Sequence, residues 1–173
     1  SGMSLRQSVQ SQAGSVDRRD LVGAAIAALL VNLVGASGVV FTTPESEWFQ
    51  SLTLPWFYPP TWAFGVVWTL LFTLIGVAAY LVYRAGVDRN DVRLALGLFA
   101  LQMIVNVAWS PAFFELQAPG LALGIIGLLW LLIVPTIWAF RRVDRRAAGL
   151  LVPYLVWVSF AAVLNGSIWL LNV

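Results

Sequence analysis

The chain has 173 residues, of which 60% are hydrophobic and only 10% are charged. A soluble domain carries about 25% charged residues because its surface must be hydrated. The composition therefore excludes an ordinary water-soluble protein and indicates a surface that faces lipid. The sequence has no cysteine, which excludes disulfides and thiolate metal sites, and no histidine, which removes the commonest general base and metal ligand.

The first 20 residues differ from the apolar remainder of the chain. Ser1-Gly2-Met3 is interpreted as a cleavage scar ahead of a native start at Met3, and the rest of residues 1–20 as a polar tail. No secretory signal precedes Leu21, and the apolar run that begins there is too long for the core of a signal peptide. We therefore assign residues 21–173 to one transmembrane domain.

Five apolar stretches are each long enough to cross a bilayer, which takes about 20 residues of helix. They cover residues 21–41, 61–83, 92–114, 121–140 and 147–171. The sequence therefore predicts an all-α protein, an integral membrane bundle of five transmembrane helices.

The charged connections between these stretches alternate in sign. All ten arginines lie in the tail or near residues 84–93 and 141–146, whereas residues 42–60 and 115–120 hold glutamates and no arginine. Arginine-rich connections stay in the cytoplasm, so the N-terminus is expected in the cytoplasm and the C-terminus outside, in a multi-pass protein of the cell membrane. A four-span or six-span arrangement would break the alternation. Arginines in short clusters between apolar runs also argue against nucleic-acid binding.

The first loop, residues 42–60, is unusually aromatic and stiff, with Trp48-Phe49, Trp56-Phe57-Tyr58 and Pro59-Pro60. One interpretation is the ordinary belt of aromatic residues at a membrane boundary. The density of rings beside the double proline favours instead a lid that packs over the helix ends. Proline is favourable as the first residue of a helix, so Pro59-Pro60 is expected to start the second span at Thr61.

Four neutral amides lie within the predicted spans. An unpaired polar group is costly in hydrocarbon, so each must form hydrogen bonds. Hydrogen bonds between helices are the preferred interpretation for Asn32 and Gln102. Asn106 stands three residues before Trp109 on the same helix face, which makes it a candidate for contact with a ligand. Asn165 is the fourth, near the end of the fifth span.

The chain has nine tryptophans, a high number for its length. Trp62 and Trp68 are on the second span, Trp109 is on the third and Trp157 is on the fifth. An indole offers a flat apolar face and one N–H donor. Several indoles around the centre of a bundle would suit a flat, hydrophobic, mostly neutral ligand, and plain aromatic packing is the alternative.

Three segments resemble motifs of the TspO/MBR family, the tryptophan-rich sensory proteins related to the translocator protein or peripheral-type benzodiazepine receptor. The segments are residues 55–68 (PWFYPPTWAFGVVW), residues 106–114 (NVAWSPAFF) and residues 153–165, which begin PYLVW and end in Leu164-Asn165. They occur in the family's order and spacing, and the resemblance spans residues 21–172.

The resemblance implies a five-helix bundle, commonly a homodimer, with no obligate cofactor. It further implies a receptor-like or transporter-like protein that binds porphyrins and haem-related tetrapyrroles in a pocket under the first loop. Trp68 and Asn106 match hydrogen-bond donors to the ligand, and Trp48 and Phe49 match aromatic residues that close the pocket. The full set of expected ligand contacts is Trp48, Phe49, Trp62, Trp68, Asn106, Trp109, Ser110, Trp157 and Asn165.

Two other functions stay open at this point. Some relatives break down porphyrin in light with the help of an aromatic residue, and Gly166 stands at that position here, which argues against this enzymatic activity. A membrane scaffold whose aromatic residues only pack is the second alternative. Sterol binding is not carried over, because the run from Leu164 to Trp169 has neither the tyrosine nor the later basic residue of the vertebrate pattern.

Overall fold

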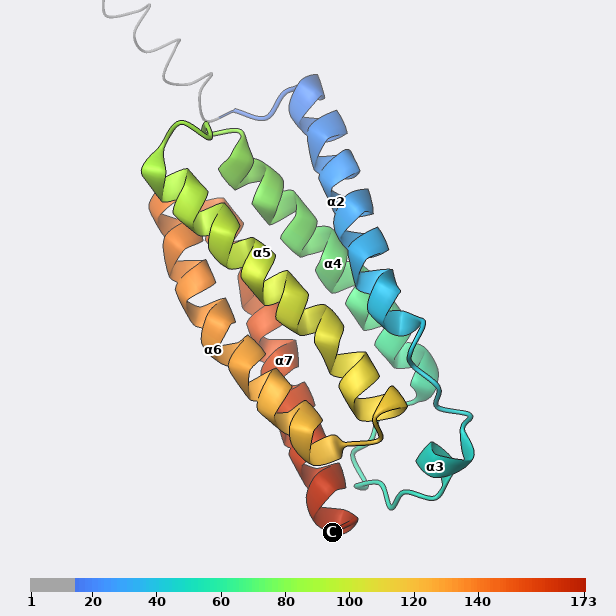
Figure 1. The fold of residues 1–173 in the computed structure, drawn as a ribbon. Coiled ribbons are helices and arrows are strands. Elements are labelled where there is room, and N and C mark those ends of the chain that lie inside the picture. Colours follow the sequence, from blue (N-terminus) through green and yellow to red (C-terminus); the bar gives the residue numbers. More distant parts are fainter. Residues whose placement is uncertain (1–14) are drawn as a thin grey trace, which may run out of the picture.

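The computed structural model of the chain describes residues 15–173 (Figure 1). Ser1-Gly2-Met3 and most of the polar tail lie outside the described residues. Five helices in the described part are long and apolar enough to cross a membrane, which confirms the all-α, five-span prediction. They are α2 (Arg18–Val39), α4 (Thr61–Tyr83), α5 (Asn90–Ser110), α6 (Pro119–Val143) and α7 (Arg145–Leu171).

Two shorter elements complete the fold. The single turn α3 (Glu47–Gln50) lies in the first loop, and the π-helical segment η1 (Pro111–Glu115) follows α5 directly. The backbone amide of Leu116 donates to the carbonyl of Pro111 over 2.9 Å, which closes this wider turn. The third span therefore continues through Pro111 and ends at Glu115.

Polar side chains and prolines set several helix ends. Asp17 and Asp20 form a reciprocal capping box of two 3.1 Å hydrogen bonds, so α2 starts at Arg18, earlier than the apolar pattern indicated. The second span begins at Thr61 as predicted, but Pro60 is its N-cap and not its first helical residue, because its ψ of 145° is extended. A proline does open α6, at Pro119.

The five long helices close into a ring. α2 packs on α4, α4 on α7, α7 on α6, α6 on α5, and α5 contacts α2 again. Buried aliphatic side chains from α4, α5, α6 and α7 fill the middle of this ring, with Ile75, Val82, Val92 and Val158 fully enclosed. A second, mostly aromatic cluster lies under the first loop, at the end of the bundle where α5 ends and α6 begins (Figure 1).

α2 and α4 approach each other closely because glycines face bulky groups across the contact. A Cβ atom placed on Gly76 would lie 2.6 Å from the Cα of Ala28, and one on Gly35 would lie 2.3 Å from the ring of Phe72. At the end where α2 begins, Arg84 forms a 2.6 Å ion pair with Asp20. Small residues at the seam and an ion pair at its end therefore hold this helix pair together.

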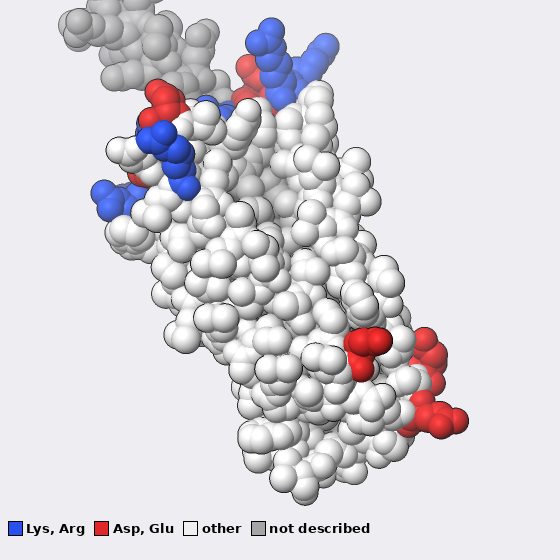
Figure 2. Space-filling model, viewed as in Figure 1, with Lys and Arg blue, Asp and Glu red and all other residues white. Residues whose placement is uncertain are grey.

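The charged side chains of residues 15–173 gather at the two ends of the bundle, with the aspartates beside the arginines. Figure 2 shows the blue arginines at the end where α2 begins and isolated red glutamates at the opposite end, where α3 and η1 lie. The pale surface between them consists of uncharged residues. This is the arrangement of a multi-pass membrane protein, as the sequence indicated. The assignment of the arginine-rich end to the cytoplasm stays a prediction.

We expect Gly76→Ala to destabilise the fold by about 1–3 kcal/mol, because the added methyl group would collide with the backbone of α2. Gly97→Ala is the matched control, since a Cβ at Gly97 meets nothing within 4 Å, and alanine stabilises a helix by about 1 kcal/mol relative to glycine. Thermal unfolding of the detergent-solubilised protein measures both effects. Equal unfolding temperatures for the two variants would show that the α2–α4 seam is looser than described.

Candidate ligand-binding site

The first loop forms a lid over the aromatic end of the bundle, as the sequence predicted. Phe49 of α3 is only 6% exposed and packs against Phe114 of η1, with ring centroids 5.5 Å apart. Trp48 meets the edge of Phe113 at 5.6 Å. Trp56, in contrast, is 94% exposed, as a residue of the membrane-boundary belt would be.

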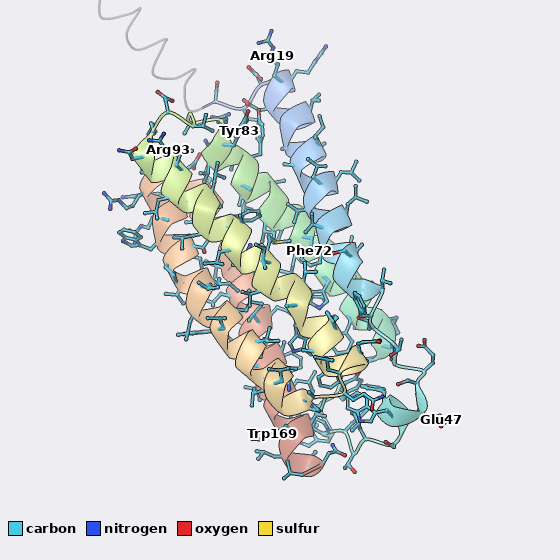
Figure 3. The ribbon with its side chains drawn as sticks, in the orientation of Figure 1. Arg19, Glu47, Phe72, Tyr83, Arg93 and Trp169 are labelled. Atoms are coloured by element: carbon cyan, nitrogen blue, oxygen red, sulfur yellow. The ribbon has the colours of Figure 1, made fainter. Side chains whose placement is uncertain are left out.

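Hydrogen bonds fasten the lid at both ends. The amide of Asn172, just beyond α7, accepts from the backbone N–H of Thr53 over 2.8 Å and donates to its carbonyl over 2.9 Å. At the other end of the loop, the hydroxyl of Thr42 donates to that of Ser110 over 3.2 Å. The predicted site residue Ser110 therefore touches the lid directly. Figure 3 shows Glu47 and Trp169 at this end of the molecule and Arg19, Tyr83 and Arg93 at the other.

Below the lid, the structure brings Trp68 of α4 and Trp157 of α7 together. Their ring centroids are 6.4 Å apart and the rings are nearly perpendicular. Trp68 also stacks on Phe72 at 5.3 Å, while Trp157 packs against Phe64 at 6.0 Å and Phe160 at 5.3 Å. We call these five rings the indole cluster. Edge-to-face contacts of this kind are the preferred geometry for aromatic pairs.

One donor in the indole cluster has no acceptor. The Nε1 atom of Trp157 is buried, and no hydrogen-bond partner exists for it within residues 15–173. Two other indoles on the spans are satisfied: Trp109 donates to Asn165 over 2.8 Å and Trp130 donates to Ser159 over 2.8 Å. A buried donor that stays unpaired costs about 1–3 kcal/mol. A ligand with an acceptor atom would recover that free energy.

An amide and phenol network lies beside the indole cluster. Asn106 donates through Nδ2 to the hydroxyl of Tyr154 over 2.7 Å, and that hydroxyl donates to Oε1 of Gln102 over 2.6 Å. Tyr154 also meets the edge of Trp68, with centroids 6.3 Å apart. The network joins α5 to α7, which confirms the predicted interhelical role of Gln102. The Asn32 prediction is confirmed as well, since its Nδ2 donates to Thr73 of α4 over 3.1 Å.

A second network connects three elements directly under the lid. Asn165 of α7 accepts from Trp109 of α5 and donates to the carbonyl of Pro119, at the start of α6, over 2.9 Å. Trp109 in turn stacks on Phe113 with centroids 5.1 Å apart. Both hydrogen-bonding groups of the Asn165 amide are used within the protein. These contacts make Trp109 and Asn165 part of the wall that supports the lid.

Trp62 is set apart from the other predicted site residues. Its side chain is 72% exposed and lines an open groove of about 650 Å³ on the outer face of α4. The remaining lining residues lie on the same face of this helix: Gly65, Val66, Thr69, Leu70 and Thr73. The structure therefore does not bring Trp62 into contact with the indole cluster.

Several residues of the site were not singled out from the sequence. Phe64 and Phe72 lie one helical turn on either side of Trp68, and Phe160 lies one turn after Trp157. Spacings of three and four residues place side chains on one helix face, so an aromatic search at this spacing would have found them. Tyr154 lies three residues before Trp157, so the same search would have found it as well, but its hydrogen bonds depend on how α7 and α5 pack.

We expect Tyr154→Phe to destabilise the protein by about 1–3 kcal/mol, because it leaves the donor of Asn106 and the acceptor of Gln102 without the hydroxyl that links them. Tyr83→Phe is the control, since Tyr83 lies exposed at the arginine-rich end. Chemical or thermal unfolding in detergent compares the two variants. A loss of stability no larger than that of Tyr83→Phe would contradict the network.

Comparison with known proteins agrees with this arrangement. The sequence model of the TspO/MBR family matches residues 26–170. The tryptophan-rich protein TspO of Chlorobaculum tepidum is 45% identical over 140 residues, which are 80% of this chain and 89% of the relative. The tryptophan-rich sensory protein of Cereibacter sphaeroides is 35% identical over 149 residues, which are 84% of this chain and 92% of the relative.

The similarity extends to animals. The translocator protein of Bos taurus is 35% identical over 143 residues, 82% of this chain and 85% of the relative. The family match reaches into all five spans and includes the lid and both hydrogen-bond networks described above. The chain belongs to the TspO/MBR family.

Proposed function

We propose that this protein is a receptor-like or transporter-like membrane protein that binds porphyrins and similar flat hydrophobic molecules in the bundle beneath the lid. The observation that carries the proposal is the buried, unpaired Nε1 of Trp157 inside a cluster of aromatic rings. A buried donor without an acceptor costs free energy and serves no purpose in packing alone.

The chemistry of the cluster suits a tetrapyrrole. Burial of a flat macrocycle against Trp68, Phe64 and Phe160 would contribute roughly 25 cal/mol per Å² of apolar surface before ordering costs are subtracted. Trp157 would donate to an acceptor atom of the ligand, and Asn106 keeps a second amide hydrogen beyond the one that it gives to Tyr154. A few donors in an otherwise apolar wall is the usual design of a small-molecule site.

Binding would require the rings to separate. Trp68 and Trp157 now contact each other at 6.4 Å, so a macrocycle between them would displace at least one indole. The lid is the segment best placed to allow this movement, because its contacts with the helix ends are mainly between aromatic side chains. A ligand that enters under the lid would reach the bundle from its arginine-free end. The positive-inside rule places this end outside the cell.

The test is a dark titration of the purified protein with protoporphyrin, followed by quenching of tryptophan fluorescence. We expect saturable binding that Trp157→Phe weakens about 5- to 10-fold, the effect of losing one hydrogen bond of roughly 1 kcal/mol. Trp157→Phe removes an unpaired buried donor but also leaves space where the larger ring stood, so the unfolding temperature of the ligand-free variant is measured beside its affinity. Trp138→Phe, at the arginine-rich end, is the control and should bind like the unaltered protein.

Other outcomes would favour the other two functions. Equal affinity for Trp157→Phe and Trp138→Phe would exclude the indole cluster as the site. Loss of the porphyrin spectrum under light, abolished by Trp68→Phe, would indicate a porphyrin-degrading enzyme. No saturable quenching at all would indicate a scaffold whose aromatic residues only pack.

A further inference from the structure

The arginines at one end of the bundle are unevenly distributed among its three connecting segments. Residues 17–20 carry two arginines and two aspartates, which cancel, and residues 84–93 carry three arginines and two aspartates, a net +1. Residues 141–146 carry four arginines and one aspartate, a net +3. Most of the excess positive charge at this end is therefore concentrated at the short turn between α6 and α7.

The ion pairs leave this excess at the α6–α7 turn unchanged. Arg84 is paired with Asp20 and Arg89 with Asp91, both over 2.6 Å. At the α6–α7 turn the carboxylate of Asp144 is occupied by Arg146 over 2.9 Å and also caps the backbone of α7. Among residues 15–173, the exposed side chains of Arg141, Arg142 and Arg145 form no ion pair.

Arg142 packs over a tryptophan of the same helix. Its guanidinium lies 5.0 Å from the ring centroid of Trp138, one turn earlier on α6. Such a contact orients the cation over the indole face. Trp138 is itself 52% exposed, as a residue at the headgroup level would be.

An exposed apolar strip continues from Trp138 toward the middle of the membrane. Val134 and Leu131 follow it on the same face of α6, and both side chains are exposed. Arg142, Trp138, Val134 and Leu131 are spaced four, four and three residues apart, which aligns them along one side of the helix. The strip thus offers cations at its end, an indole at the boundary and aliphatic groups below.

We infer that the α6–α7 turn is a binding site for an anionic phospholipid. The phosphate of the headgroup would contact Arg141, Arg142 and Arg145, and an acyl chain would lie along Trp138, Val134 and Leu131. Charge complementarity selects an anionic headgroup over a zwitterionic one. The aliphatic strip favours a lipid over free phosphate, because phosphate has no acyl chain to bury against it. This site is at the opposite end of the bundle from the lid and does not depend on porphyrin binding.

The experiment is native mass spectrometry of the full chain, delipidated in detergent and then titrated with palmitoyl-oleoyl phosphatidylglycerol or with the corresponding phosphatidylcholine. We expect the unaltered protein to retain phosphatidylglycerol in preference to phosphatidylcholine. The triple substitution R141Q/R142Q/R145Q should weaken phosphatidylglycerol binding by about tenfold or more, since each arginine near a lipid surface contributes to this attraction. Work in detergent removes any effect of the substitutions on membrane insertion.

The matched control is R18Q/R19Q/R93Q, which also removes three positive charges from the same end of the bundle. It should keep the affinity and the preference for phosphatidylglycerol. Equal losses in the two triple variants, or no preference in the unaltered protein, would overturn the site. Displacement of phosphatidylglycerol by millimolar inorganic phosphate would also overturn it, because the acyl strip would then contribute nothing. Trp138→Ala separates the two parts of the site and should weaken binding while all three arginines remain.

Discussion

The structure depends on one constraint: in hydrocarbon, every backbone and side-chain polar group needs a partner within the protein. The chain meets the backbone part of this requirement with five long helices. It meets the side-chain part with paired amides, of which Asn165, bonded to both Trp109 and Pro119, is the fullest example. One buried side-chain donor in the described part of the chain does not meet this requirement. A buried indole N–H without an acceptor, at Trp157, stands out because its surroundings are otherwise satisfied.

The spans and their number could be predicted from the sequence because both follow from one-dimensional properties. Apolar runs of bilayer length and the positions of ten arginines do not depend on how the helices pack. The helix ends were less predictable. α2 starts earlier than predicted because Asp17 and Asp20 form a capping box. Pro60 is the N-cap of α4, and not its first helical residue, because its backbone is extended. Both helix starts depend on local hydrogen bonds and backbone angles, which a hydropathy pattern does not contain.

Only part of the arrangement around the candidate site could be predicted from the sequence. Trp68 and Trp157 meet in the indole cluster, but Trp62 lies apart from it. The hydrogen-bond partners of Asn106 and Trp109 depend on helix packing that is absent from the sequence pattern. Asn106 and Trp109 illustrate this well. They lie on one face of α5, but Asn106 bonds to Tyr154 and Trp109 bonds to Asn165, two residues that are eleven positions apart on α7. Three positions along α5 thus correspond to eleven along α7, and residue spacing alone could not have predicted this pairing.

α7 connects the two ends of the molecule that differ most in chemistry. It begins at the arginine-rich turn after α6 and ends against the lid, and Trp157 lies near the midpoint between Arg145 and Leu171. The two ends are held by different forces: the arginine-rich end has ion pairs such as that of Arg84 with Asp20, whereas the lid end relies on aromatic rings and the hydrogen bonds of Asn172. Aromatic contacts are individually weak and can be re-formed with another flat ring. The lid end is therefore where the proposed hydrophobic ligand would enter without loss of a charge pair.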